Sequence, residues 1–186
     1  YTGEGVLIGQ IRWGDGEDMH AVILLSDLRN STPLAETMTR AEFLVYLNQF
    51  FDGMAGAVVD NGCEILRFIG DAVLAIFPIE RNHNNESGRD ACSEVEMACE
   101  RAVNAVKAAR SAIAETNIEL LSTGQPEIKY GIGMHIGDLT YGNIGIPERL
   151  EFTVIGSAAN EAARIEAMTK DLNVPVLISD TFASAY

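Results

Sequence analysis

The stretch of sequence that decides the fold is AVILLSDLRNSTP, residues 21–33. Its first five residues are all apolar, which is typical of a central strand buried on both faces. The strand ends at Asp27, and a short polar loop follows. Thr32 and Pro33 then predict the start of a helix, with threonine as the N-cap and proline at the first helical position. A buried strand therefore delivers a carboxylate close to the point where a helix begins.

Strand and helix patterns alternate on both sides of this stretch. We expect strands at residues 5–12, 64–68, 72–77, 128–136, 140–144, 152–155 and 174–178, with tight hairpins at 69–71 and 137–138. We expect helices at 33–60 (one or a pair), at 91–115, at 157–169 and in a stub from 179. A turn is expected at 14–18, and polar loops at 81–90 and 117–126. This order predicts an α+β fold, a ferredoxin-like core sheet with flanking helices mostly on one face.

Composition excludes several classes of function. The chain has 186 residues and a formal net charge of −14, from 27 acidic and 13 basic residues. Such a surface repels phosphate backbones, so nucleic acid is not an expected partner. Apolar runs such as Ala21–Leu25 and Ala72–Phe77 are far too short to span a membrane. Cys63, Cys92 and Cys99 match no zinc spacing and predict buried, reduced thiols in a cytoplasmic protein.

Two aspartates are the strongest candidates for chemistry. Asp27 ends the buried strand, and Asp71 lies in the hairpin turn at 69–71. In a βαβ arrangement the first two strands are parallel, so both carboxylates reach the same edge of the sheet. Such a pair can hold Mg²⁺ or Mn²⁺, and these ions in turn bind triphosphate oxygens. The loop from Leu28 to Thr32 ends at a helix N-terminus, where free N–H groups favour a phosphate.

Asn160 and Arg164 form a second candidate pair. They are four residues apart on a predicted helix and therefore share one face. A carboxamide beside a guanidinium can orient a ribose and stabilise the charge on a phosphoryl group during transfer. The spacing alone favours an ordinary exposed pair.

Five motifs together resemble those of the class III adenylyl and guanylyl cyclases. Residues 26–32 (SDLRNST) and 69–73 (IGDAV) resemble the two metal motifs of that family. Residues 131–137 (GIGMHIG) with 141–145 (YGNIG) are similar to its glycine-marked hairpin. The signature strand and helix of the family resemble EFTVIG at 151–156 and ANEAARIE at 159–166. The motifs occur in the family's order and span most of the chain.

This resemblance implies a role for each matching residue. Asp27 and Asp71 would bind two Mg²⁺ or Mn²⁺ ions, helped by the Leu28 carbonyl, while Asn160 would orient the ribose and Arg164 would stabilise the transition state. The substrate-binding residues would be Arg67 and Thr153, which read the purine, and Asn30, Ser31 and Thr32 in the first metal motif. The family's active site lies between two catalytic domains, so a homodimer would hold two sites.

The activity expected from the resemblance is that of an adenylate cyclase, which converts ATP to cyclic AMP and pyrophosphate. Adenylyl members usually carry Lys where Arg67 stands, so guanylyl cyclase activity on GTP is an alternative. Asn30 and Ser31 replace the Gly-Phe that is common in the metal motif. A catalytically silent nucleotide-binding or dimerisation module is a second alternative. The retention of four polar site residues argues against it, namely Asp27, Asp71, Asn160 and Arg164. A diguanylate cyclase is disfavoured because its Gly-Gly-Asp/Glu-Glu-Phe turn is missing.

The resemblance also divides the chain. Residues 1–19 would form a strand and turn that lead into a catalytic domain at residues 20–186. The chain stops at Tyr186, before the stretch where the family usually places a further phosphate-contacting basic residue, so we expect the C-terminal end of the domain to be truncated. The opening Tyr1-Thr2-Gly3 begins in the middle of a pattern, which predicts a regulatory domain upstream.

Overall fold

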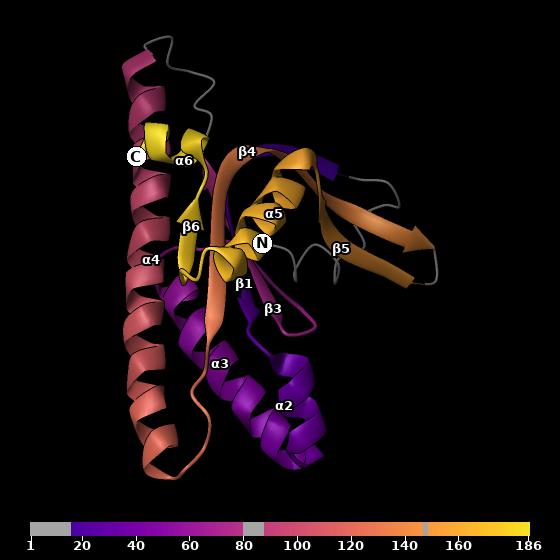
Figure 1. Cartoon of the computed structure of the whole chain (residues 1–186). Helices are drawn as coiled ribbons and strands as arrows, with labels where there is room; N and C mark the ends of the chain where they lie inside the picture. Colours follow the sequence, from indigo (N-terminus) through magenta and orange to yellow (C-terminus); the bar gives the residue numbers. More distant parts are fainter. Residues whose placement is uncertain (1–15, 80–87, 147–148) are drawn as a thin grey trace.

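The computed structural model describes residues 16–79, 88–146 and 149–186. The predicted strand at 5–12 and most of the predicted loop at 81–90 lie outside the described residues. The elements, shown in Figure 1, are β1 (Gly16–Leu28), α2 (Ser31–Thr37), α3 (Arg40–Asp60), β2 (Ile65–Ile69), β3 (Ala72–Ile79), α4 (Gly88–Ser122), β4 (Tyr130–Ile146), β5 (Arg149–Ile155), α5 (Ser157–Asp171), β6 (Val176–Ile178) and α6 (Asp180–Ala185).

The sheet has the strand order of a ferredoxin-like core. Its path is β2-β3-β1-β4-β5, and β6 pairs with β4. Both β1 and β2 run antiparallel to β3, so they are parallel to each other. β4 runs antiparallel to β1, and the short β6 adds a parallel strand beside β4. The α+β class, the ferredoxin-like core and the parallel relation of the first two strands are confirmed.

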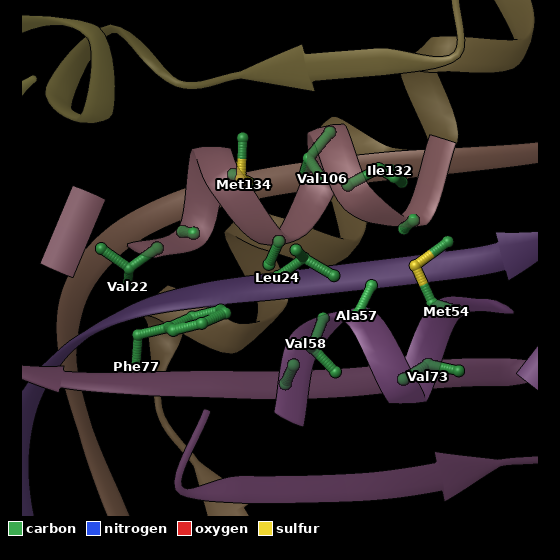
Figure 2. Close-up of a cluster of buried hydrophobic side chains, with 14 of the residues drawn as sticks. Val22, Leu24, Met54, Ala57, Val58, Val73, Phe77, Val106, Ile132 and Met134 are labelled. Carbon is green, nitrogen blue, oxygen red and sulfur yellow. The ribbon is translucent and has the colours of Figure 1, made fainter. Parts of the chain in front are cut away.

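The central strand is buried on both faces, as its sequence predicts. Val22 and Leu24 are fully buried in a core between the sheet and helices α3 and α4, part of which is shown in Figure 2. Ala21 and Ile23 point to the opposite face, where Ala158 of α5 belongs to a smaller cluster. Helices therefore cover both faces, with α3 and α4 on one and α5 on the other, because side chains alternate along a strand.

The first helix begins earlier than predicted. The N-cap is Asn30, which has a left-handed backbone (φ 57°) and no side-chain capping bond, so the prediction of Thr32 as the N-cap is wrong. The Leu34 N–H bonds to the Asn30 carbonyl at 3.1 Å, which places Pro33 in the first turn, where its missing N–H costs nothing. The segment is a pair of helices, and Thr39 starts α3 with a capping box.

The predicted hairpin at Gly137–Asp138 is wrong, because β4 is one continuous strand through both residues. The glycines that resemble a turn motif instead allow close packing. A Cβ atom on Gly137 would lie 2.8 Å from the Ala158 Cβ of α5, and one on Gly133 would lie 2.4 Å from the Glu166 nitrogen. The real hairpin joins β4 to β5, with Ile146 opposite Arg149.

Two predicted irregular segments are partly regular. Residues 16–18 of the predicted turn belong to β1, and the Thr140 hydroxyl binds Asp18 at 2.6 Å. Residues 117–122 of the predicted loop belong to α4. The amide side chain of Asn117 bonds both backbone groups of Ile128, at 2.7 and 3.0 Å, so the loop folds back onto the helix.

Two of the predictions from composition can be compared with the described part of the chain. None of its helices is both long and apolar enough to cross a membrane. Cys63 and Cys99 form no disulfide. Cys99 is buried, which raises the pKa of its thiol to about 11, whereas Cys63 is only half-buried, so the prediction of a buried thiol is wrong for Cys63. The side chain of Cys92 lies outside the description.

Candidate active site

The fold brings Asp27 and Asp71 together at one end of the sheet. Asp27 lies at the end of β1, opposite Ala72 of β3. Asp71 is in the β2–β3 turn, which Gly70 closes with a left-handed backbone (φ 63°). The backbone N–H of Leu28 donates to the Asp71 carbonyl at 3.3 Å and ties the strand end to the turn. The predicted convergence of the two residues is therefore confirmed.

The electrostatics of this edge fit a cation. Burial raises the pKa of the Asp27 carboxyl, and the negative charge of Asp71 raises it further, while Arg29 and a backbone bond at Leu28 lower it. Ionised Asp27 is thus held in a place that disfavours its charge. A divalent cation between the two carboxylates would remove this penalty, since positive charge favours the ionised form.

The two carboxylates fit magnesium or manganese better than a metal whose ligands all come from the protein. Within the described residues no group of three or more His, Cys, Asp or Glu side chains could hold a metal ion. Two carboxylates would leave most coordination positions open. Mg²⁺ accepts such sites because it keeps several waters and binds substrate phosphates.

The loop after Asp27 leads directly into α2. Asn30 takes the left-handed conformation, and Ser31 and Thr32 lie in the first turn of the helix. The first backbone N–H groups of a helix have no partner within it, so they remain available to an anion. These three residues thus follow Asp27 closely in the chain, at the same end of β1.

A buried ion pair beneath this edge was not predicted as part of the site. Arg29 lies 3.4 Å from the carboxylate of Glu166 on α5 and donates to the Thr169 hydroxyl. Burial raises the pKa of Glu166, and the Arg29 guanidinium opposes that shift. Gly131 leaves the space, because a Cβ there would lie within 2.4 Å of all three side chains. Both charged residues occur in the quoted motifs, but nothing in a single sequence marks them as paired.

Asn160 and Arg164 lie together on α5, as their spacing predicts. Both are exposed, and Arg164, with 75% of its side chain accessible, pairs with Glu161 at 3.2 Å. Among the interactions of the described residues, none joins either side chain to Asp27 or Asp71. The two halves of the predicted site therefore remain separate within one chain.

The predicted purine-reading pair lies far apart in the strand order. Arg67 is half-buried on β2, opposite Leu74 of β3. Thr153 is on β5, opposite Gly142 of β4, and its side chain lies outside the description. Strands β3, β1 and β4 intervene, although β4 curves strongly along its length (Figure 1). The sheet thus does not place the two residues on neighbouring strands.

The sheet order and the aspartate pair at its edge are those expected of the class III cyclases. Residues 17–183 match the family model described as "Adenylate and Guanylate cyclase catalytic domain". Because this match covers most of the chain, the chain belongs to the family of adenylate and guanylate cyclase catalytic domains.

Relatives of known structure or activity agree with this assignment. The chain is 30% identical over 174 residues to an adenylate cyclase of Anabaena cylindrica, covering 94% of this chain and 32% of that protein. It resembles the structure of the guanylyl cyclase Cya2 with a TM-score of 0.72 and 28% identity, covering 91% of this chain and 79% of that one. The adenylyl cyclase CyaB from P. aeruginosa has the same fold, with a TM-score of 0.76 at 22% identity over 92% of this chain and 82% of that one. The chain thus spans about a third of the curated relative, 32% of its length.

Proposed function

We propose that this domain is an adenylate cyclase that converts ATP to cyclic AMP and pyrophosphate. The observation that carries the proposal is the convergence of Asp27 and Asp71 at one sheet edge, where burial and mutual repulsion raise the pKa of Asp27. Family membership supports the reaction class, and the similarity to an adenylate cyclase of Anabaena cylindrica supports the substrate.

In the proposed reaction the ribose 3′-hydroxyl gives up its proton to solvent, and its oxygen forms a bond to the α-phosphorus. The bond from that phosphorus to the pyrophosphate oxygen breaks, and pyrophosphate leaves. Asp27, Asp71 and the Leu28 carbonyl would hold two Mg²⁺ or Mn²⁺ ions. When bound, these ions would lower the pKa of the attacking hydroxyl and neutralise charge on the triphosphate. Asn30, Ser31 and Thr32 would receive phosphate oxygens at the start of α2.

The second half of the site would come from a partner copy. Asn160 would orient the ribose, and Arg164 would stabilise the charge on the transferred phosphoryl group. Both face solvent in the single chain, where Arg164 pairs with Glu161 of its own helix and so remains accessible to a partner. Phe68 and Ile69, beside Asp71, leave 49% and 50% of their surface exposed, which supports an interface at this edge.

The preference for ATP rests on hydrogen-bonding groups. Arg67 can only donate, whereas the Thr153 hydroxyl donates or accepts. Adenine offers an acceptor at N1 and a donor amino group, which complements this pair, whereas guanine N1 and its amino group need an acceptor such as a carboxylate. GTP is the second candidate substrate, because the similar structure of Cya2 is that of a guanylyl cyclase.

The test is to incubate the domain with ATP or GTP and Mn²⁺ and to identify the product by mass spectrometry. Cyclic AMP should form, with kcat/KM for ATP roughly ten- to a hundredfold above that for GTP. Equal or better turnover of GTP would overturn the substrate assignment. Nucleotide binding without any cyclic product would instead support the silent-module alternative.

The remaining assignments concern the protein beyond this domain. We infer a cytoplasmic location and a regulatory segment outside residues 20–186. The match to only 32% of the Anabaena cylindrica protein supports the second inference, because most of that relative lies outside the matched part.

A further inference from the structure

A cavity of about 530 Å³ lies beside the end of β1 that carries Asp27. Asn30 is among its lining residues, but neither Asp27 nor Asp71 is. Its walls come from the end of β1, the second half of α4, the start of β4 and the turn between α5 and β6. In Figure 1, β4 begins beside the lower part of α4, below β6. The cavity therefore occupies the free edge of β4, before its pairing with β6 starts at Ile132.

The charge of this cavity is opposite to that of the protein. The chain has 27 acidic and 13 basic residues, yet the cavity is lined by four of the basic ones and, within the described residues, by no acidic one. The four are Arg29, Arg110, Lys129 and Lys170. Like charges that gather in a concave site repel one another, and an anion removes that repulsion.

Contacts within the fold account for only part of this charge. Arg29 pairs with Glu166, and Arg110 bonds to the Tyr130 side chain. Lys170 lies in the last turn of α5, where the helix dipole favours a cation. Lys129 has no such partner, and neither lysine forms an ion pair with another described residue. The cavity thus keeps two exposed ammonium groups beside two guanidinium groups.

The shape of the site indicates which anion it fits. The four cations reach the cavity from four different segments, so a ligand must offer negative charge in several directions. A phosphate group does this with three terminal oxygens, whereas a carboxylate has two oxygens in one plane. Part of the wall is apolar, with Ile113 and Val174, and the volume exceeds that of a single phosphate.

We propose that this cavity binds a small phosphate-bearing organic molecule at a site that adjoins the proposed active site at Asn30 but does not include the aspartate pair. The inference does not rest on the proposed function, because it uses neither metal nor turnover. The proximity of Arg29 to Asp27 would let such a ligand influence the aspartate edge through the end of β1.

The test uses inorganic pyrophosphate as the probe in EDTA, with binding measured by titration calorimetry. Without divalent cations the carboxylates of Asp27 and Asp71 repel the probe, so binding should report the cavity. The variant K129Q/K170Q should bind on the order of tenfold more weakly. A variant with the same loss of charge outside the cavity, R40Q/K107Q, should bind like the wild type.

Amide chemical shifts provide a second readout. Pyrophosphate should move the signals of residues 129–130 and 169–173 but not those of the Gly70 turn. Unchanged affinity in K129Q/K170Q, absent binding, or shifts centred on the Gly70 turn would each overturn the site. Equally tight binding of citrate would overturn the phosphate class.

Discussion

At the scale of single residues, the site is held at a cost to the fold. The pKa of Asp27 is raised by burial first and by Asp71 second, so the folded domain disfavours the ionised carboxylate. A group whose pKa is raised by folding contributes stability below its unfolded value, and this contribution is lost as the pH rises through the folded value. At neutral pH the metal-free domain is therefore less stable than it would be without this charge. Such a penalty is typical of groups retained for function.

We predict that Asp27→Asn separates stability from activity. The metal-free variant should melt at a higher temperature than the wild type at pH 7, and the gain should shrink as the pH falls toward the unfolded pKa of about 3.8. Mn²⁺-dependent turnover should fall by more than about a hundredfold, since a metal ligand is worth several kcal/mol. Circular dichroism melts in EDTA and a turnover assay measure both effects.

The exposed Asp52→Asn on α3 is the control for that variant and should change neither quantity. An Asp27→Asn protein that kept most of its turnover would contradict the metal assignment.

At the scale of elements, the glycines of β4 decide how closely α5 approaches the sheet. Their spacing also fits a turn, which is why the sequence pattern wrongly predicted a hairpin at Gly137. The strand continues through this position without a turn, and α5 packs on backbone that carries no side chain. The position of α5 matters for the site because Asn160, Arg164 and Glu166 all lie on this helix.

We predict that Gly137→Ala destabilises the domain by about 1–3 kcal/mol, the usual cost of overpacking. The added Cβ would lie 2.8 Å from the Ala158 Cβ. Neither atom is at the end of a flexible side chain, so the contact is relieved only if the strand and the helix move apart. Urea unfolding measures the change, and the double variant Gly137→Ala/Ala158→Gly should recover part of it because the two positions touch.

Gly56→Ala is the matched control for Gly137→Ala. No atom lies within 4 Å of the added Cβ, and Gly56 is inside α3, so this variant should gain up to about 1 kcal/mol. Equal effects of the two substitutions would show that close packing is not what Gly137 provides.

At the scale of the whole molecule, the sequence predicts what local patterns determine. These patterns are the apolar run at 21–25, the turn at Gly70 and the five motifs in their order. Together they predict the central strand, the β2–β3 hairpin and the meeting of Asp27 with Asp71. Contacts between distant segments were not predictable in this way. The burial of Glu166 against Arg29 depends on how α5 sits on β4, and the four cations of the cavity lie on four segments that only the fold brings together.

The same limit applies to assembly, because one chain holds its two predicted half-sites apart. Asp27 and Asp71 lie at the sheet edge, whereas Arg164 extends into solvent from α5, 75% exposed.

If a partner copy completes each site, an inactive Asp27→Asn chain mixed with an inactive Arg164→Ala chain should regain activity. Half of the randomly mixed dimers would be heterodimers with one intact site of two, which gives about a quarter of wild-type turnover. A mixture of Asp27→Asn with Asp71→Asn is the matched control and should stay inactive, since both lesions fall in the same half-site and every site carries one. Subunit exchange is checked by co-purification of differently tagged chains. Exchange without recovered activity in the first mixture would mean that each chain completes its own site.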